Sequence, residues 1–362
     1  MIRAVVVLIA LMPAAAGAID TPEPADGAIR FAAYNVALED RAGGLIAHLE
    51  AGLPKARLSA EIIQAVRPDV LLLLELDRDP AGRSLSLYAD NYVAVGQNGR
   101  DGIDYPHRVH LPSNTGVPTG LDLDGADGIG ASGIEYARDA KGFGWHEGHY
   151  AFVLLSRHPV VSVRTFTQLL WDDMPGARLQ KATPKAVRAV LPLSSKTHAI
   201  ITLDVDGTPI HVIAAHPTPP IGHPRNIPRN ADEIRMAVDL THAARSQYAV
   251  DDAGVRGGLA PGAHFVVMGD LNADPQKGRS AAGAIDYLLS DPLVNRTDPG
   301  SVLGKNDTAE FESGMRLRVD YVIPSKGLLP GASGVVWPAA GDPLENASDH
   351  RMVWVDVTIH PE

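Results

Sequence analysis

The sequence predicts a single domain of the mixed α/β (α+β) class, in which strands and helices alternate along the chain. Short apolar runs that end in polar residues are typical of buried strands, and they are interleaved with segments of helical periodicity. A chain of 362 residues is long enough to bury a sizeable core. No internal repeat and no linker divides it, so one domain over residues 19–362 is favoured over two.

The composition is that of an acidic, folded protein. The 32 Lys and Arg residues are outnumbered by 43 Asp and Glu residues, which gives a formal net charge of -11. This balance disfavours nucleic acid as a partner, because non-specific binding requires clustered cations that neutralise phosphates. A small phosphorylated substrate needs only a local positive site. The absence of cysteine excludes disulfides and thiolate sites, so any metal must be bound by oxygen and imidazole ligands.

Residues 1–18 predict a signal peptide. Arg3 precedes an apolar run over residues 4–12, and Ala16, Gly17 and Ala18 form a small-x-small cleavage site. The alternatives are a membrane anchor or an ordinary helix, but the run is shorter than the roughly 20 residues that span a bilayer. No later segment is long enough to span a membrane. We therefore expect an exported protein, periplasmic or extracellular.

The first part of the chain predicts two strands separated by helix. Residues 29–35 form an apolar run that ends in a polar residue, and helical periodicity runs from about Leu45 through residues 57–66. Pro68 ends that helix, because proline cannot continue it. Residues 69–75 form a continuous apolar run, which is typical of a strand buried on both faces.

The middle of the chain predicts a long inserted loop at about 97–148, because this segment is dense in Gly, Asp and His. A loop of this length is usually functional or disordered. Core character returns at residues 150–156. The later strands are expected at 187–193, 197–205, 209–215, 265–268, 317–323 and 352–359, with a hairpin at 206–207, a helix over 231–248, and half-buried alternation in the last two strands.

Polar residues stand where these apolar runs end. They are Asn35, Glu75, His216, Asp270, Asn272, Asp320 and the triplet Ser348-Asp349-His350. Each alone has an ordinary explanation, such as a solvated strand end, a turn or a satisfied core histidine. Together they predict one site, because functional residues are commonly carried on loops at strand ends. Asp270 and Asn272 are one position apart and project to the same side of an extended segment.

These positions resemble the motifs of the endonuclease/exonuclease/phosphatase superfamily, which includes pancreatic-type deoxyribonucleases, abasic-site endonucleases, neutral sphingomyelinases and inositol polyphosphate 5-phosphatases. The motifs are Leu-Glu-Leu-Asp at Glu75, Ala-Ala-His-Pro at His216, Gly-Asp-Leu-Asn-Ala-Asp over 269–274, Arg-Val-Asp-Tyr-Val at Asp320, and Ser-Asp-His at 348–350. They occur in the family's order over nearly the whole chain. The resemblance implies a four-layer α/β/β/α sandwich of two packed, mostly antiparallel sheets flanked by helices, with the site at one edge.

The resemblance also implies metal-dependent hydrolysis of a phosphoester. Glu75 is the first metal ligand, with Asn35 and Asp349 completing or supporting the shell. An all-oxygen shell suits Mg²⁺, with Mn²⁺ or Ca²⁺ as alternatives. Such an ion reduces the repulsion between the phosphate and an incoming hydroxide.

The remaining roles follow from the same resemblance. Asp270 orients and deprotonates the attacking water, and Asn272 donates to a phosphoryl oxygen. His350 stabilises the phosphoryl charge, while Asp320 fixes its tautomer. His216 contacts the phosphate or protonates the leaving oxygen, as a histidine with a pKa near neutrality can. In the nuclease branch a further acid orients this histidine, and the sequence identifies none.

Three groups of residues are open to two interpretations. His107, Arg108 and Arg229 could bind the substrate phosphate or could be ordinary surface residues. Asp122, Asp124 and Asp127 could hold a structural Ca²⁺, but no bidentate Glu follows at the expected distance, so a solvated acidic turn is the alternative. Asp274, which precedes Pro275, is expected to fix the turn and not to take part in the chemistry.

The acidic charge and the expected export favour a phosphodiester or phosphomonoester of a small or lipid-derived compound as substrate. A secreted nuclease is the alternative, and its signature would be a face rich in Lys and Arg, which the sequence does not show. A non-catalytic binding protein on the same fold is a remote alternative. It predicts that catalytic positions are missing, whereas all of them are present.

Overall fold

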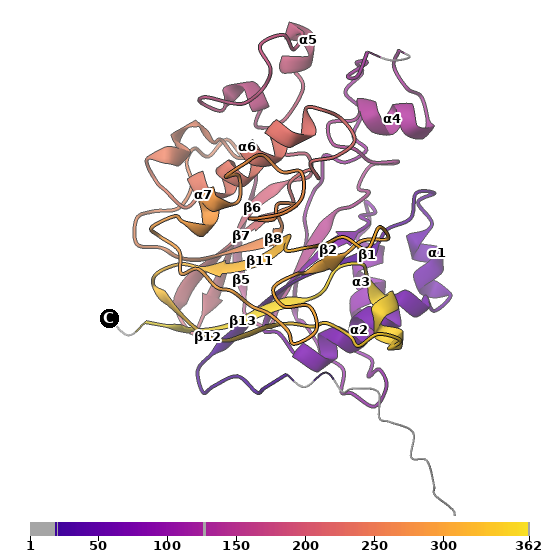
Figure 1. The fold of residues 1–362 in the computed structure, drawn as a ribbon, viewed down its shortest axis with the longest axis vertical. Helices are drawn as coiled ribbons and strands as arrows, with labels where there is room; N and C mark the ends of the chain where they lie inside the picture. The colour runs from indigo at the N-terminus through magenta and orange to yellow at the C-terminus, as the bar shows by residue number, and fades with distance from the viewer. Residues whose placement is uncertain (1–18, 20, 126–127, 361–362) are drawn as a thin grey trace, which may run out of the picture.

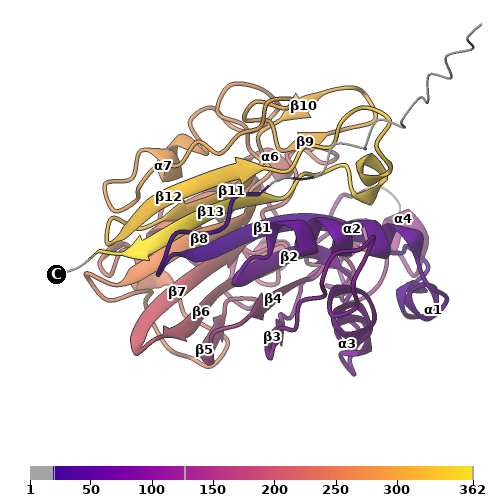
Figure 2. The same cartoon turned by 90° about the horizontal axis from the view of Figure 1, so that it is seen from below.

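The computed structural model describes residues 19, 21–125 and 128–360 and arranges them in four layers (Figure 1). Two sheets pack face to face, with helices on both outer sides (Figure 2). The helices on the two outer sides are α1 (Leu45–Glu50), α2 (Pro54–Val66) and α3 (Arg83–Tyr88) on one, and α6 (Asn226–Asp239) and α7 (Asp286–Leu289) on the other. This confirms the expected sandwich. The predicted signal peptide, residues 1–18, lies outside the described residues.

The first sheet has six strands, in which only β1 and β2 pair in parallel. Its order is β12 (Leu328–Val335), β13 (Val353–Ile359), β1 (Ile29–Leu38), β2 (Val70–Leu76), β4 (Phe152–Ser156) and β3 (His107–His110). Helices α1 and α2 cross over between β1 and β2, so the carboxyl ends of both strands reach the same edge. That edge therefore receives both Asn35 and Glu75.

The second sheet has five strands, in which only β7 and β8 pair in parallel. Its order is β11 (Asp320–Pro324), β8 (His264–Asp270), β7 (Thr208–Ala215), β6 (His198–Val205) and β5 (Val160–Thr165). The predicted hairpin joins β6 and β7 at residues 206–207. The parallel pair again carries two polar residues to one edge, because His216 follows β7 directly and Asp270 ends β8.

Three separate apolar layers hold the four layers together, and β2 shows how its sequence serves two of them. Leu71 and Leu73 pack against the helices, while Leu72 and Leu74 pack between the two sheets. This alternation confirms the expected burial of β2 on both faces. Truncating one of these leucines, as in Leu72→Ala, would cost about 2–5 kcal/mol of stability.

Several element predictions were wrong in detail. Residues 187–193 are not a strand: the short helix α5 (Lys185–Arg188) lies there, and Pro192 makes only an isolated bridge. Proline has no N–H to extend a ladder. The expected helix over 231–248 begins earlier, as α6, and ends at Asp239. The last two strands do not alternate, because both sheets are covered on both faces; β11 is wholly buried and β13 largely so.

The segment 97–148 is not a loop throughout, because it contributes β3 to the sheet edge and contains helix α4 (Gly133–Asp139). The remaining short elements are η1 (Ala89–Val93), η2 (Trp171–Asp173), η3 (Arg245–Tyr248), β9 (Ala309–Glu310), β10 (Arg316–Leu317) and η4 (Pro343–Ala347). No helix in the described part of the chain is long and apolar enough to span a membrane.

Candidate active site

The strand ends meet around the carboxylate of Asp270, which is 1% exposed. Its Oδ2 accepts a hydrogen bond from Asn35 Nδ2 at 3.3 Å and lies 3.5 Å from His216 Nε2 and 3.7 Å from His350 Nε2. Its Oδ1 accepts the backbone N–H of Asn272 at 2.9 Å. The structure therefore brings together, around one buried carboxylate, residues from four separate strand ends.

Gly269 explains how Asp270 reaches this position. Its φ of 151° lies outside the usual range for other residues, and a Cβ built there would lie 1.8 Å from the carbonyl oxygen of Ala215 in β7. Glu75 and Asn272 also adopt positive φ, at 59° and 52°. Left-handed backbone at residues other than glycine is costly, and it recurs at functional sites as well as in ordinary turns.

His350 and Asp320 form a buried pair beside Asp270. His350 Nδ1 donates to Asp320 Oδ2 at 2.9 Å, and Asp320 is held opposite Asp270 by the register of β11 and β8. Ser348 anchors the triplet, because its Oγ donates to the carbonyl of Asn35. Burial alone would lower the pKa of His350, but the Asp320 and Asp270 carboxylates raise that pKa well above its usual range. His350 is therefore an imidazolium, while burial raises the pKa of Asp320 to about 6.

Glu75 and His216 form the other side of the site. Glu75 Oε1 lies 3.7 Å from His216 Nε2. Burial raises the pKa of Glu75 to about 7, although the nearby charge of Lys196 opposes this. Burial and Lys196 lower the pKa of His216 to about 4, so its ring is neutral at pH 7. Its Nδ1 is buried without a hydrogen-bond partner among the described residues, so no described acid beyond Asp270 and Glu75 bonds this ring.

The residues present fit a divalent cation. One oxygen each from Glu75 and Asp270 and one nitrogen of His216 lie within 4.8 Å of one another. The raised pKa of Glu75 indicates that its charge lacks a close partner, and a cation would supply one. Asn35 lies near enough to Glu75 to oppose the rise in its pKa, and its Nδ2 donates to Asp270 Oδ2. Asp349 is exposed and belongs to no such group of described residues, so the structure does not bring it to the other predicted ligands.

His107 and Arg108 lie far from this edge. They are in β3, where His107 pairs with Ser156, and Ser156 in turn pairs with the start of β2, at the opposite end from Glu75. Arg108 donates to Asp90 Oδ1 at 2.6 Å. The structure therefore corrects the interpretation of this pair as substrate-binding residues, because the polar segment that carries them is an edge strand and not a loop at the site.

Arg229 is also occupied elsewhere. Its guanidinium is buried and donates to the carbonyl oxygens of Leu193, Pro192 and Lys141. Burial lowers its pKa to about 10. Arg229 is therefore neither a free cation for the substrate phosphate nor an ordinary surface residue, because its guanidinium holds three loop carbonyls.

The acidic turn predicted at Asp122, Asp124 and Asp127 is held by a further carboxylate, that of Asp139. Asp122 and Asp124 lie beside Asp139 of α4, while Asp127 lies outside the described residues. Both carboxylate oxygens of Asp139 and one of Asp122 accept backbone N–H groups of this turn. The carboxylates thus hold the turn, and bound Ca²⁺ there stays a prediction.

Asp274 fixes the turn after Asn272, as expected. Its Oδ1 accepts the backbone N–H groups of Gln276 and Lys277, and its Oδ2 accepts that of Arg318. With all its bonds directed at the backbone, Asp274 tethers the segment after Asn272 to the segment before Asp320.

Lys196 is a member of the site that the sequence patterns did not reveal. It is 6% exposed, and burial lowers its pKa against the opposing charges of Glu75, Glu233 and Asp270. The available signal is weak: Lys196 precedes a strand, and no acid stands between residues 174 and 203 to pair with it locally. Its position depends on β6, whose first residue pairs with the residue before His216.

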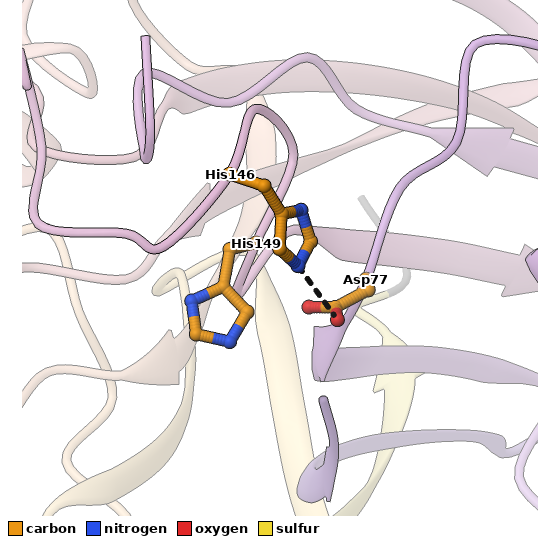
Figure 3. Close-up of side chains that lie close together, drawn as sticks. All are labelled: Asp77, His146 and His149. Atoms are coloured by element: carbon orange, nitrogen blue, oxygen red, sulfur yellow. Dashed lines mark ion pairs between the residues drawn. The ribbon is translucent and has the colours of Figure 1, made fainter. Parts of the chain in front are cut away.

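A second group of histidines and acids, here called the loop cluster, also escaped prediction. It consists of Glu39, Asp77, His146 and His149, of which Figure 3 draws the last three. His149 Nε2 lies 2.8 Å from Glu39 Oε2, and His146 Nε2 lies 3.5 Å from Asp77 Oδ2. The cluster ties the end of the 97–148 segment to the ends of β1 and β2.

Comparison with known proteins agrees with this architecture. The endonuclease/exonuclease/phosphatase family profile matches residues 32–350. A structure of an endonuclease/exonuclease/phosphatase from Beutenbergia cavernae DSM 12333 is similar at 19% identity and a TM-score of 0.52, covering 92% of this chain and 72% of that one. A family protein from Leptotrichia buccalis C-1013-b is similar at 16% identity and a TM-score of 0.50, covering 92% and 100%.

The catalytic domain of human Nocturnin, solved with bound sulfate, is similar at 14% identity and a TM-score of 0.50, covering 92% of this chain and 94% of that domain. No curated protein matches the sequence. The low identities establish the shared fold, and the match to the family profile extends over most of the chain. This chain belongs to the endonuclease/exonuclease/phosphatase family.

Proposed function

We propose that this protein is a divalent-metal-dependent phosphoesterase in which Asp270 activates the attacking water. The observation that carries the proposal is the position of this carboxylate, which is buried with Asn35, His216 and His350 around its Oδ2. Burial alone would raise the pKa of Asp270, but the charge of His350 and the hydrogen bond from His216 hold that pKa below its usual range. Asp270 is thus ionised at neutral pH and can accept a proton from a bound water.

Glu75 and Asn35 would hold the metal, for which we propose Mg²⁺, with Mn²⁺ or Ca²⁺ as alternatives. When bound, the ion would supply positive charge that reduces repulsion between the phosphate and the attacking oxygen. Glu75 suits this role because it faces the site from the end of β2, while its backbone is fixed at a positive φ.

The other side chains position and stabilise the phosphate. Asn272 Nδ2 donates to the carbonyl of Pro217 at 3.1 Å, which leaves its second N–H for a phosphoryl oxygen. His350, kept protonated by Asp320, stabilises the negative charge that develops in the transition state. His216 contacts the phosphate as a neutral ring; its lowered pKa argues against the role of proton donor to the leaving oxygen.

For the substrate, we propose a phosphodiester or phosphomonoester of a small or lipid-derived compound. The net charge of -11 supports this over a polyanion. Arg108 and Arg229, two cations considered for a phosphate, are engaged with Asp90 and with loop carbonyls. Export to a periplasm or the medium is a further part of the proposal, and it rests on the sequence of residues 1–18.

A substrate panel tests the proposal. The purified protein would be assayed on an aryl phosphodiester, a phosphomonoester, DNA and RNA, each with Mg²⁺, with EDTA, and with Mg²⁺ restored after EDTA. We expect hydrolysis of a small ester that EDTA abolishes and Mg²⁺ restores. Fast DNA or RNA cleavage with inert small esters would favour a secreted nuclease instead. Turnover of none of them would favour a binding protein.

A further inference from the structure

The Lys196 ammonium lies at the site without an ion-pair partner among the described residues. Its side chain is 6% exposed, yet its ammonium makes no hydrogen bond or ion pair with any residue in the described part of the chain. The Glu75 and Asp270 carboxylates are near enough to favour its charge, and burial disfavours it. The Lys196 Nζ atom is not among the fully buried polar atoms that lack a partner in the described residues, so the ammonium is reached by solvent and is accessible to a ligand.

The backbone around Lys196 is held firmly, so the position of the side chain is built into the fold. Glu233 of α6 accepts from the backbone N–H and the hydroxyl of Ser195, both at 2.6 Å. Its other oxygen accepts the backbone N–H of Thr218, two residues after His216, at 2.7 Å. On the other side, the carbonyl of Lys196 accepts the N–H of Asn114 at 3.0 Å. One buried acid therefore fixes Lys196 and the His216 loop together.

Two roles are compatible with a buried lysine beside carboxylates. As a permanent counter-ion, Lys196 would form a direct salt bridge with Glu75 or Asp270, as Arg30 does with Asp356 at 2.7 Å elsewhere in the chain. No such contact exists for Lys196 among the described residues. An ammonium that lies near these carboxylates but outside contact distance leaves its donors available for a further anion.

The charges of the site are also arranged on two sides. His350 supplies positive charge beside Asp320, and Lys196 supplies it beside Glu75 and His216. A phosphoryl group carries negative charge on several oxygens, and cations directed at different oxygens stabilise it together.

We propose that the Lys196 ammonium binds a non-bridging phosphoryl oxygen of the substrate at the Glu75–His216 side of the site. This inference rests on the proposed function and adds the cation that takes the second side of the phosphate. Arg108 and Arg229, the cations predicted for this role, are bonded instead to Asp90 and to loop carbonyls.

Binding and turnover of Lys196→Met test the proposal, with the exposed Lys181→Met as matched control. Isothermal titration with orthophosphate in Mg²⁺ would measure phosphate affinity independently of activity. We expect Lys196→Met to raise the phosphate Kd about 10–100-fold. We expect kcat/KM for the ester hydrolysed by the wild type to fall by about 10²–10³-fold. Lys181→Met should change neither quantity by more than about twofold, as for a solvated surface charge.

The thermal midpoint separates binding from a structural role. Removing a charge that has no protein partner should leave the midpoint of Lys196→Met unchanged or higher. If that variant does not fold, Lys196→Gln, which keeps a polar end, takes its place. Phosphate binding that is absent from the wild type, or unchanged in the folded variant, would overturn the role of Lys196. Failure of the wild type to hydrolyse any ester would instead overturn the proposed function, while the titration still decides the role of Lys196.

Discussion

Two groups of histidines and carboxylates lie side by side at the end of β2, since Glu75 belongs to one and Asp77 to the other. The first, here called the central cluster, contains Asn35, Glu75, His216, Asp270, Asp320 and His350. The second is the loop cluster of Glu39, Asp77, His146 and His149. Their residue types are nearly the same, but their hydrogen bonding is not.

In the loop cluster the polar atoms are already satisfied. Both oxygens of Asp77 accept backbone N–H groups, from Asp40 and Tyr150, and both ring nitrogens of His146 and His149 have partners. In the central cluster, His216 Nδ1 and Asp320 Oδ1 are buried without one in the described part of the chain. Buried unpaired polar atoms also occur elsewhere in the described chain, such as His264 Nδ1, so these two are informative because they lie beside the Asp270 carboxylate. We therefore propose chemistry for the central cluster and loop anchoring for the loop cluster.

The largest expected effect is that of Asp270→Asn. The amide keeps the shape of the carboxylate but cannot accept a proton from water, so kcat should fall by about 10³-fold or more. Phosphate release from the identified ester measures it. A kcat within tenfold of the wild type would remove Asp270 from the role of base.

Glu75→Gln should weaken metal binding more than it weakens folding. Replacing the charged oxygen should raise the Mg²⁺ concentration for half-maximal activity by at least about 10–100-fold. A titration with Mg²⁺ after EDTA treatment gives this concentration, with Glu50→Gln on the surface of α1 as control. An unchanged half-saturation would place the metal elsewhere.

Asp320→Asn should change the pH dependence of turnover. The Asp320 carboxylate raises the pKa of His350, so its removal lowers that pKa. Because the protonated ring is the active form, the variant should lose activity at lower pH than the wild type does. We expect a loss of about 10–100-fold at pH 8 and a smaller loss at pH 6. The profile of kcat against pH tests this, and an unshifted alkaline limb would contradict it.

His146→Gln should affect stability and not turnover. The hydrogen bond with Asp77 raises the pKa of His146 from 6.5 to about 9, although burial opposes the shift. Because the folded-state pKa is the higher one, this contribution is full below pH 6.5 and is lost as pH rises through about 9. Because the His146 ring is partly exposed, we expect this contribution to the free energy of unfolding to be only about 1–2 kcal/mol. Urea unfolding of the wild type and of His146→Gln at pH 6 and at pH 9.5 measures this contribution. An equal difference in unfolding free energy at the two pH values would contradict the prediction.

The sequence was sufficient for the parts of the site that depend on local pattern. An apolar run followed by Asn35, Glu75, His216 or Asp270 predicts a polar residue at a strand end, and two parallel pairs bring such ends to one edge. Gly269 begins the Gly-Asp-Leu-Asn-Ala-Asp motif in the sequence. The structural reason for this glycine, the close approach of Ala215, lies in a different strand.

Lys196 and the loop cluster could not be predicted because long-range contacts place them. The position of Lys196 depends on Glu233, which is 37 residues later in α6 and acts through Ser195. Histidines 146 and 149 are meaningful only after the chain folds back onto Glu39 and Asp77. Similarly, residues 187–193 have a strand-like composition, but Pro192 limits them to a single bridge.

The comparison between the clusters is tested most directly by the same substitution in each. We expect His350→Ala to lower kcat/KM by about 10²-fold or more, because the cation beside the phosphate is lost. His149→Ala should keep kcat/KM of the folded protein within about tenfold and lower the thermal midpoint by about 2–8 °C, because Glu39 loses its buried partner. A folded His149→Ala protein without activity, or a His350→Ala protein with activity near that of the wild type, would contradict the assignment of chemistry to the central cluster.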